Sequence, residues 1–483
     1  MTRLATLLGG WPGTPEPLPP LDVGGLSQDS RRVRPGDAFV ALPGAQAHGM
    51  AFAAEALAAG AVVVLHDAAD APPADIAASC IAVEGLNART VDLVRRFHGE
   101  AVAGLDLFAV TGTNGKSSVA WLMAQALGGA MVGTLGIGRP GAMAESDHTT
   151  PDLFTTWRAL AELAGQGVGS VALEASSHAL DQGRLAGLTF TATAFTNLGH
   201  DHLDYHLTRE AYGAAKARLF LDHASRRQWI NLDDPFGRML ASNLRERDGL
   251  RTYALDPSRG ADVTAEIRRA DLDGLALTLH LPGGPVEAET PLIGRVNVLN
   301  LMVVAGELAE RGFDGPTIAE RLAALVPVPG RMNRVDGADR RVIIDYAHTP
   351  DALESALAAL RPLTGGQLFC VFGCGGNRDR AKRPEMGRIA ESLADRVILT
   401  DDNPRHEDGL AIVREIQAGM QRPERSRVMR DRAEAIRLAI REAGSDDVVL
   451  VAGKGHEREQ VVGDTVRPFS DFDAVRAALE EAA

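Results

Sequence analysis

Residues 110–118 read Val110-Thr111-Gly112-Thr113-Asn114-Gly115-Lys116-Ser117-Ser118, a glycine-rich stretch that lies between two apolar patterns. The apolar run from Leu105 to Val110 predicts a buried strand, and apolar residues from Val119 to Ala126 recur at the spacing of a helix. The glycines therefore occupy a strand-to-helix turn, where backbone N–H groups and the helix N-terminus can bind phosphate oxygens. Lys116 adds a positive charge and Ser117 a hydroxyl for Mg²⁺. The stretch predicts a nucleoside triphosphate site within an α/β fold.

The match to the phosphate-loop motif is incomplete. The strict pattern requires a glycine at the position of Val110, so only the part from Gly112 to Ser117 fits. An ordinary glycine turn with a solvated lysine is the alternative interpretation. The predicted strand before the stretch and the predicted helix after it favour the nucleotide site.

Length and composition limit the class of protein. A chain of 483 residues is too long for one ordinary core and suggests about three domains. The formal net charge of −14 argues against general nucleic-acid affinity, so an anionic substrate would need a local basic pocket. Three cysteines are too few for a disulfide framework, which favours a reducing cytoplasm. We expect neither export nor membrane insertion, because the N-terminus lacks a signal-peptide core and no long apolar run occurs.

The pattern along the chain predicts three α/β domains. Residues 1–97 form a small N-terminal α/β domain, with strand-like runs at 37–42 and 61–65 around a helical pattern at 52–59. Residues 98–331 alternate strands with longer helices, as in a central phosphate-loop ATPase domain with a mostly parallel sheet. A glycine-rich stretch at 249–294 indicates an antiparallel insertion, and the prolines at 326–330 mark a boundary.

Residues 332–483 predict a C-terminal Rossmann-like α/β domain. Its short apolar runs at 342–344, 368–372, 396–400 and 448–451 are typical of strands, and a polar segment follows each run directly. In an open α/β sheet, ligands bind at the carboxyl ends of the strands. We therefore expect a second site, formed by residues 345–348, 373–378, 401–405 and 453–457.

Acidic and histidine residues in the central domain are candidates for a metal site. Glu174 follows a predicted strand at 171–173, where a carboxylate beside the phosphate loop can bind Mg²⁺; a solvated acid is the alternative. Three histidines and two aspartates lie within residues 200–206. A transition-metal site is one interpretation, but the spacing fits no zinc motif and the oxygen-rich surroundings favour Mg²⁺. Helix capping by Asp201 is another.

Lys216 lies on the apolar face of a predicted helix, because Tyr212, Lys216 and Phe220 are spaced four residues apart. Such a lysine commonly extends its ammonium group to solvent. Partial burial is the alternative, and it would lower the pKa of the amine and make a neutral amine available for modification or catalysis.

These segments, in this order, resemble the Mur ligases, which are ATP-dependent amino-acid-adding enzymes of peptidoglycan precursor synthesis. The resemblance covers almost the whole chain and is carried by residues 111–117, 174–178, 197–206, 215–220, 330–336 and 345–351. Within the family, the tetrapeptide Asp402-Asn403-Pro404-Arg405 is similar to the signature of the branch that adds meso-2,6-diaminopimelate. The lysine-adding branch differs within that tetrapeptide.

The resemblance implies an acid–amino-acid ligase. ATP phosphorylates the free carboxylate of UDP-N-acetylmuramoyl-L-alanyl-D-glutamate, and the amine of meso-diaminopimelate attacks the acyl phosphate, with release of ADP and phosphate. By the same resemblance, domain closure would keep water from the acyl phosphate, and the N-terminal, central and C-terminal domains would bind UDP, ATP and the amino acid. We expect a monomer with no nucleic-acid partner.

Site residues follow from the resemblance, position by position. ATP would contact Gly112, Thr113, Asn114, Gly115, Lys116, Ser117, Ser118, Asn297, Arg331, Asp345 and His348. Mg²⁺ would be held by Ser117, Glu174, His202 and Lys216, with Lys216 carbamylated by CO₂ to N6-carboxylysine. Lys116, Glu174, His202 and Lys216 would be the catalytic residues.

The substrates would occupy the remaining matched positions. Ser30 would contact the uridine part, and the muramoyl-peptide would contact Thr149, Thr150, Ser176, Gln182 and Arg184. Diaminopimelate would contact Arg378, Asp402, Asn403, Pro404, Arg405, Gly453 and Glu457. Arg405 would distinguish diaminopimelate from L-lysine, because its guanidinium can hold a carboxylate that lysine lacks, and Glu457 would take the ammonium group.

Three alternatives remain open at this point. They are an L-lysine-adding homologue, a folylpolyglutamate synthetase-like ligase with the same glycine loop, and a nucleotide-dependent switch that hydrolyses ATP without forming a bond. The N-terminal domain argues against the folate enzyme, and diacid-binding arginines have no purpose in a switch. Serine at position 117, where many relatives have threonine, offers the same hydroxyl.

Overall fold

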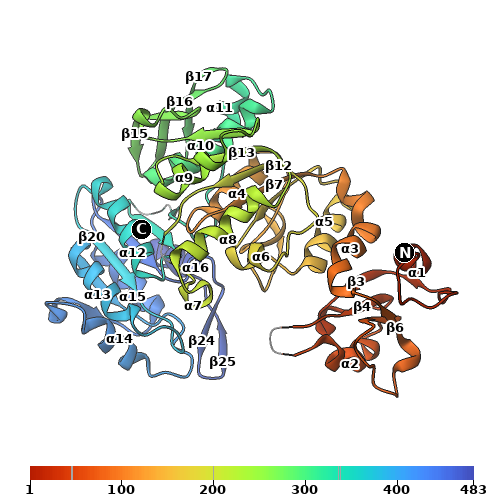
Figure 1. Cartoon of the computed structure of the whole chain (residues 1–483). Coiled ribbons are helices and arrows are strands. Elements are labelled where there is room, and N and C mark those ends of the chain that lie inside the picture. Colours follow the sequence, from red (N-terminus) through yellow and green to blue (C-terminus); the bar gives the residue numbers. More distant parts are fainter. Residues whose placement is uncertain (45–46, 200, 336, 338, 483) are drawn as a thin grey trace. The chain divides into compact units, whose positions relative to one another are not determined.

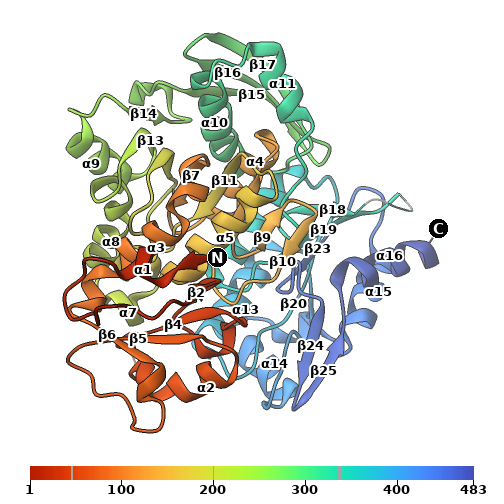
Figure 2. The ribbon, with the colours of Figure 1, turned by 90° about the vertical axis from the view of Figure 1, so that its right-hand side faces the viewer.

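The computed structural model describes residues 1–44, 47–199, 201–335, 337 and 339–482. The chain divides into two compact units, Met1–Asp262 and Val263–Ala483 (Figures 1 and 2). In the described part of the chain, no helix is long and apolar enough to span a membrane. The expected domain boundaries near residues 97 and 331 stay predictions.

The first unit begins with a four-stranded parallel sheet, in the order β3-β4-β5-β6. The strands expected at 37–42 and 61–65 are confirmed as β4 and β5, with the expected helix as α2 between them. The elements of this part are β1 (Thr2–Arg3), α1 (Leu4–Leu8), β2 (Asp22–Val23), β3 (Gly25–Ser27), β4 (Asp37–Ala41), α2 (Ala53–Ala58), β5 (Val63–Asp67), β6 (Cys80–Val83) and α3 (Leu86–Ala103).

An eight-stranded sheet forms the rest of the first unit, in the order β10-β9-β8-β11-β7-β12-β13-β14. Its pairs are parallel from β8 to β14, and only the pairs of β9 with β8 and with β10 are antiparallel, so the mostly parallel sheet is confirmed. The strands are β7 (Asp106–Thr111), β8 (Ala130–Gly133), β9 (Gly136–Arg139), β10 (Ala142–Ala144), β11 (Ser170–Glu174), β12 (Phe190–Phe195), β13 (Ser225–Asn231) and β14 (Leu250–Tyr253). The helices are α4 (Lys116–Ala126), α5 (Leu153–Gly165), α6 (Ser177–Asp181), α7 (Leu203–His206), α8 (Arg209–Leu221) and α9 (Pro235–Leu244).

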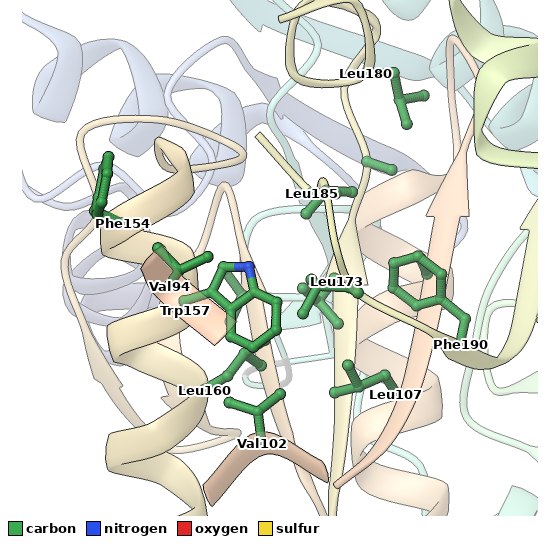
Figure 3. Close-up of a cluster of buried hydrophobic side chains, with 14 of the residues drawn as sticks. Val94, Val102, Leu107, Phe154, Trp157, Leu160, Leu173, Leu180, Leu185 and Phe190 are labelled. Carbon is green, nitrogen blue, oxygen red and sulfur yellow. The ribbon is translucent and has the colours of Figure 1, made fainter. Parts of the chain in front are cut away.

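The buried packing of β7 explains how this sheet holds the phosphate loop. Leu107 and Ala109 belong to a buried cluster that includes Trp157 of α5 and Val102 of α3. Figure 3 shows Leu107, Val102 and Trp157 gathered with side chains of neighbouring strands. Helix α4 packs on β7, β8 and β11. Because β7 is buried by packing on its neighbours, its carboxyl end and the start of α4 are fixed at the sheet edge.

The second unit begins with a separate antiparallel sheet of β15 (Thr264–Asp271), β16 (Gly274–Leu281) and β17 (Gly284–Thr290). The antiparallel insertion expected at 249–294 is therefore present, but its first part was assigned wrongly. Residues Leu250–Tyr253 form β14, which pairs in parallel with β13 and extends the eight-stranded sheet. The helices α10 (Arg295–Glu310) and α11 (Gly315–Ala323) follow.

A six-stranded sheet in the order β18-β19-β23-β20-β21-β22 forms the C-terminal part. All pairs except β18 with β19 are parallel, and the four predicted strands are β19, β20, β21 and β23. The strands are β18 (Asn333–Val335), β19 (Arg341–Asp345), β20 (Leu368–Phe372), β21 (Arg396–Leu399), β22 (Arg427–Val428) and β23 (Val448–Ala452). These parallel strands confirm the α/β class of the domain.

Residues of β23 alternate between two buried clusters, as a strand covered on both faces requires. Val448, Leu450 and Ala452 pack with α12, α13 and α14, whereas Val449 and Val451 pack with α15 and α16. The helices are α12 (Pro350–Leu360), α13 (Lys382–Leu393), α14 (Gly409–Gln417), α15 (Arg432–Glu442) and α16 (Asp471–Ala482). A two-stranded hairpin, β24 (Glu459–Val462) and β25 (Thr465–Pro468), follows β23 (Figure 1).

Candidate active site

The glycine stretch forms a tight loop between β7 and α4, as predicted. Gly115, with φ of 85°, precedes the first turn of α4. Gly112 passes so close to Thr196 that a Cβ would lie 1.9 Å from Thr196 Oγ1. Lys116 Nζ donates to the carbonyl oxygens of Gly112 at 2.9 Å and Thr113 at 2.8 Å. The loop is therefore folded around its own lysine, with backbone N–H groups at the helix start.

The end of β12 holds this loop from the side. Thr196 Oγ1 donates to the Asn114 carbonyl oxygen at 2.6 Å, and Asn197 Nδ2 donates to the same atom at 3.1 Å. Asn114 N in turn donates to Asn197 Oδ1 at 3.0 Å. Two adjacent parallel strands thus fix the loop.

The Glu174 carboxylate ends β11 and is 1% exposed. Ser117 Oγ donates to Glu174 Oε2 at 2.8 Å, and the Thr134 backbone N–H donates to Oε1 at 2.8 Å. A serine hydroxyl and a carboxylate held together at the N-terminus of α4 are hard oxygen ligands of the kind that Mg²⁺ prefers. The donor set at Ser117 and Glu174 fits this ion.

Thr134 is a site residue that the sequence interpretation missed. Its hydroxyl donates to Thr149 Oγ1 at 3.0 Å and to Glu174 Oε2 at 3.4 Å. A Cβ on the preceding Gly133 would lie 2.2 Å from Glu174 Oε1, so glycine is needed there. The signal that could have found Thr134 is its place directly after β8, the strand beside β11, because polar residues at this edge meet.

Lys216 is buried, so the second interpretation of its side chain, burial on the apolar face of the helix, is confirmed. Its side chain lies on α8 and is 1% exposed, and Nζ donates to the Gly112 carbonyl oxygen at 2.8 Å. The ammonium group also lies 4.3 Å from the centre of the Tyr212 ring. Burial lowers the pKa of Lys216 well below its usual value, and the nearby charge of Lys116 lowers it further. Both lysines therefore share one carbonyl of the phosphate loop.

Histidine rings gather beside this lysine. The His178 ring centre lies 4.7 Å from that of His202, 4.2 Å from that of Tyr205 and 5.4 Å from that of His206. Burial lowers the pKa of His178, His202 and His206. Among the residues that the structure describes, no three His, Cys, Asp or Glu side chains are grouped to hold a metal ion. His200 lies outside the described residues, and a metal-binding role for His202 stays a prediction.

The residues expected to bind the muramoyl-peptide form one network at the end of β11. Thr150 Oγ1 donates to the Glu174 carbonyl oxygen at 2.6 Å and accepts from Ser176 N at 3.1 Å. Arg184 Nη1 donates to the Thr150 carbonyl oxygen at 2.7 Å, while its Nε and Nη2 hold Gln182 Oε1 at 3.0 and 2.7 Å. Together with Thr149, which Thr134 contacts, all five predicted residues lie around Glu174.

Ser30 starts a short 3₁₀ turn, Ser30–Arg32, and is 6% exposed. Beside it is a cavity of about 320 Å³ with four arginines among its lining residues, which are Leu26, Ser27, Arg31, Arg32, Val33, Arg34, Thr155 and Arg158. All four arginines are paired with carboxylates, Arg31 with Asp29, Arg32 with Asp147, Arg34 with Glu162 and Arg158 with Asp37, so their positive charges are balanced in this structure. Ser30 itself does not line the cavity, so its contact with uridine stays a prediction.

In the second unit, Asp345 closes β19 and is 9% exposed. Met332 N donates to Asp345 Oδ2 at 2.8 Å, and burial raises the pKa of Asp345 to about 6. The Arg331 guanidinium lies 5.7 Å from the centre of the Tyr346 ring, and His348 Nδ1 donates to the Tyr346 carbonyl oxygen at 2.8 Å. Asn297 Nδ2 donates to the Ile293 carbonyl oxygen at 2.8 Å. Asp336, in the motif that contains Arg331, lies outside the described residues.

Replacing Asp345 with asparagine should remove a pH dependence of stability. The pKa of Asp345 is about 6 in the folded protein and 3.8 in the unfolded chain, so the folded protein holds this proton more tightly. The free energy of unfolding therefore falls as pH rises from about 4 to about 6 and changes no further above that range. Asparagine keeps an acceptor for Met332 N, so the variant should gain up to about 3 kcal/mol over the natural chain at neutral pH. Calorimetric unfolding from about pH 4 to about pH 8 measures this, with exposed Asp464→Asn as the control. A gain that is equal at all pH values would contradict the expectation.

The loops after β20 and β21 are joined to each other. Gly376 N donates to the Asn403 carbonyl oxygen at 2.9 Å, and a Cβ on Gly376 would lie 1.8 Å from the Pro404 carbonyl oxygen. Arg405 has a φ of 52° and donates from Nη1 to the Gly376 carbonyl oxygen at 2.9 Å. Arg378, in the first loop, is exposed. The two predicted diacid-binding arginines therefore come from loops that share hydrogen bonds.

Arg383, which the sequence interpretation missed, ties these loops to α13. Its side chain is 0% exposed and donates to both carboxylate oxygens of Glu407 at 2.9 and 3.0 Å, and to the Gly375 carbonyl oxygen at 3.1 Å. The Arg383 hydrogen bond and the Asn377 N–H lower the pKa of Glu407 to about 2. A fully ionised pair thus holds the base of both loops.

The β24–β25 hairpin also holds Arg405, through its backbone. Arg405 N donates to the Val461 carbonyl oxygen at 3.0 Å, and Gly463 N donates to the Arg405 carbonyl oxygen at 2.7 Å. Residue 405 thus pairs in parallel with Val462 as an isolated bridge. The tetrapeptide that carries Arg405 is held by a later segment of the chain.

Gly453 and Asp402 also meet at this edge. Gly453 has a φ of 117°, and a Cβ there would lie 2.6 Å from Asp402 Oδ2. Burial raises the pKa of Asp402, whose side chain is 7% exposed. All seven residues expected to bind the diacid follow β20, β21 or β23, which are neighbours in the sheet.

Three family models match the chain. They are described as Mur ligase family, catalytic domain (residues 22–104), Mur ligase middle domain (residues 110–308) and Mur ligase, glutamate ligase domain (residues 330–455). The glycine loop falls within the second match, and the third contains Arg378, residues 402–405 and Gly453 but ends two residues before Glu457.

Curated relatives extend the similarity to nearly the full length. The chain is 47% identical over 466 residues to UDP-N-acetylmuramoyl-L-alanyl-D-glutamate--2,6-diaminopimelate ligase of Xanthomonas campestris pv. campestris (strain 8004), covering 95% of this chain and 94% of the relative. It is also 47% identical over 463 residues to the protein of the same name from Pseudomonas aeruginosa, covering 94% of each. The chain therefore belongs to the Mur ligase family.

Solved structures of related proteins have a similar fold. A structure of a ligase with that same name has a TM-score of 0.70 and 36% identity, covering 96% of this chain and 95% of that chain. A folylpolyglutamate synthase from Thermotoga maritima shares the fold alone, with a TM-score of 0.59 and 16% identity over 75% of this chain. The three-domain α/β class expected from the sequence is that of the Mur ligases.

Proposed function

We propose that this chain is the ATP-dependent ligase that adds meso-2,6-diaminopimelate to UDP-N-acetylmuramoyl-L-alanyl-D-glutamate in peptidoglycan precursor synthesis. The observation that carries the proposal is the phosphate loop, in which one carbonyl, that of Gly112, accepts from both Lys116 and the buried Lys216. Relatives at 47% identity that bear this name support the choice of substrates.

The phosphate loop would bind ATP. Lys116 and the loop N–H groups hold the β- and γ-phosphates, where negative charge must be offset during phosphoryl transfer. The γ-phosphoryl group passes to the free carboxylate of the UDP-dipeptide, giving an acyl phosphate and ADP. The amine of diaminopimelate then attacks the acyl carbon, an amide bond forms, and phosphate and the amine proton leave.

Mg²⁺ would be held at Ser117 and Glu174, whose oxygens already lie 2.8 Å apart. In sites of this kind Mg²⁺ takes one or two carboxylates together with substrate phosphates and water, and it neutralises phosphate charge. We extend the donor set to His202 and to Lys216 as a carbamate. Lys216 suits carbamylation because burial favours the neutral amine that must attack CO₂.

Diaminopimelate would lie on the loops after β20, β21 and β23. Arg405 uses Nη1 on the Gly376 carbonyl, which positions the guanidinium for a carboxylate. Arg378 would hold a second carboxylate and Glu457 the ammonium group.

We further propose that Asn297, Arg331, Asp345 and His348 contact the nucleotide. The domains would divide near residues 97 and 331, and the protein would be a cytoplasmic monomer. Free Cys80, Cys370 and Cys374 support a reducing compartment.

Phosphate release tests the reaction itself. We expect release from ATP to require the UDP-dipeptide and meso-diaminopimelate together, because the acyl phosphate forms only on the first and is consumed only by the second. The amount of inorganic phosphate released is measured with each component omitted in turn, and the mass of the product is determined for the complete mixture. Equal release with ATP alone would indicate a switch protein, and product formation from folate and glutamate would indicate the folate enzyme.

A further inference from the structure

Lysine is rare in this chain, and each lysine holds a loop. Only four of the 50 basic residues are lysines: Lys116, Lys216, Lys382 and Lys454. The first two lie at the phosphate loop, and Lys382 Nζ donates to the His348 carbonyl oxygen at 2.8 Å. The fourth, Lys454, follows β23 at the edge where the diacid is expected, and none of the roles given above uses it.

Lys454 is 0% exposed and is directed at two neighbours. Its Nζ donates to Glu457 Oε2 at 2.9 Å and to Asn403 Oδ1 at 3.1 Å. A compact ammonium with three donors suits two acceptors that lie in different directions, whereas the planar fork of arginine suits one carboxylate. Removing one partner of such a buried pair is costly, because the other charge is left without compensation.

The Asn403 side chain is occupied by the same arrangement. Its Oδ1 accepts from Lys454 Nζ and from Val461 N at 3.0 Å, and its Nδ2 donates to Glu457 Oε2 at 2.9 Å. Two acceptor sites on Oδ1 are thereby filled. Asn403 therefore holds Lys454, Val461 and Glu457, and a donor of the diacid could bond to Oδ1 only by displacing Lys454 or Val461.

One Glu457 oxygen is fixed and the other is not. Oε2 accepts from Lys454 and Asn403, whereas Oε1 has no hydrogen-bond donor among the described residues. The side chain is 33% exposed, so this carboxylate is reachable. Lys454 and the Asn403 hydrogen bond lower the pKa of Glu457 although burial opposes them, which keeps the group ionised.

We propose that Lys454 is a positioning residue for amino-acid selection. With Asn403, it fixes Glu457 Oε2 so that Oε1 is left to receive the ammonium group of the diacid. This inference rests on the proposed function, in which Glu457 takes that group. Lys454 touches no substrate and acts through Glu457.

A double-mutant cycle tests this coupling. Lys454→Met, Glu457→Gln and the double variant are assayed in the full chain with UDP-dipeptide, ATP and meso-diaminopimelate. We expect Lys454→Met to raise the KM for diaminopimelate roughly tenfold or more, with the KM values for ATP and UDP-dipeptide within about twofold. The double variant should lose little beyond the worse single variant, because both substitutions remove one interaction.

Two variants of exposed hairpin residues are the controls. Arg467→Met removes a cation from β25, and Glu459→Gln neutralises a carboxylate on β24; both should leave the three KM values unchanged. Lys454→Gln keeps N–H donors and should recover part of the loss. If Lys454→Met does not fold, as judged by its unfolding transition, the cycle is measured with Lys454→Gln.

The outcomes separate the two proposals. Additive losses in the cycle, or equal rises in KM for all three substrates, would overturn the role of Lys454 while the ligase function stands. An unmodified protein that does not turn over meso-diaminopimelate would overturn the function itself. A selective, non-additive rise in the KM for the diacid supports both.

Discussion

Replacing Lys216 with alanine is expected to lower kcat roughly 10²- to 10³-fold, the range seen when one preorganised electrostatic group is removed from an active site. The reason is the position of its amine, which lies on the Gly112 carbonyl of the phosphate loop and is buried enough to favour the neutral form. Addition of CO₂ to the neutral amine forms an N–C bond and releases one proton, and the ammonium form must lose another proton first, so a side chain that could carry a positive charge becomes a carboxylate. Alanine removes both the amine and the carboxylate.

Chemical rescue measures this effect. Bicarbonate should not restore Lys216→Ala, whereas acetate or formate should restore part of kcat by supplying the missing carboxylate. Lys116→Ala is the matched control, since it removes the other lysine on the same carbonyl and should gain nothing from carboxylates. A second readout is independent of turnover: ¹³C-labelled bicarbonate should give a carbamate signal that is absent from Lys216→Ala. Full activity of Lys216→Ala would show that the lysine is merely structural.

Replacing Arg405 with alanine should abolish the preference for diaminopimelate over L-lysine. A site built around a buried polar pair rejects an analogue that lacks the partner by roughly 10⁴- to 10⁵-fold, because the site group is then desolvated and unpaired. Arg405 has little freedom to turn away from the site, because its backbone has a φ of 52° and its Nη1 donates to the Gly376 carbonyl oxygen. Lysine lacks the carboxylate that would meet the remaining donors.

The measurement is kcat/KM for both amino acids in the same phosphate-release assay. The variant should lose nearly all of its activity with diaminopimelate and change little with L-lysine, so the ratio moves toward one. Arg425→Ala, at an exposed arginine of the same unit, should keep the natural ratio. A natural chain that prefers L-lysine would contradict the use assigned to Arg405.

Strand patterns were predicted well because buried parallel strands are short apolar runs that contrast with their surroundings. The runs at 368–372 and 448–451 became β20 and β23, and the polar segments after them meet at one edge as expected. The failure at residues 250–253 has the same origin. A four-residue strand gives no periodicity that separates parallel from antiparallel pairing, so its partner β13 could not be identified from the sequence.

Burial of individual side chains was harder to predict. Helical spacing placed Lys216 on an apolar face, but only the packed structure shows that the Gly112 carbonyl lies above it. Thr134 and Arg383 were missed for a related reason, and Lys454 lay in the predicted site segment 453–457 without a role of its own. Each acts on a group distant in sequence, at Glu174, Glu407 and Asn403. A motif identifies residues that touch a ligand more readily than those that hold these residues in place.

The pairing of Arg405 with the β24–β25 hairpin has a consequence for protein engineering. The backbone of Arg405 belongs to the tetrapeptide at 402–405 and is also held by hydrogen bonds to the backbone of Val461 and Gly463. Transplanting the four residues alone would transfer the guanidinium without the hairpin backbone that holds residue 405 in this chain. If Arg405 selects the amino acid as proposed, a graft that aims to change this selectivity has to carry the hairpin together with the tetrapeptide.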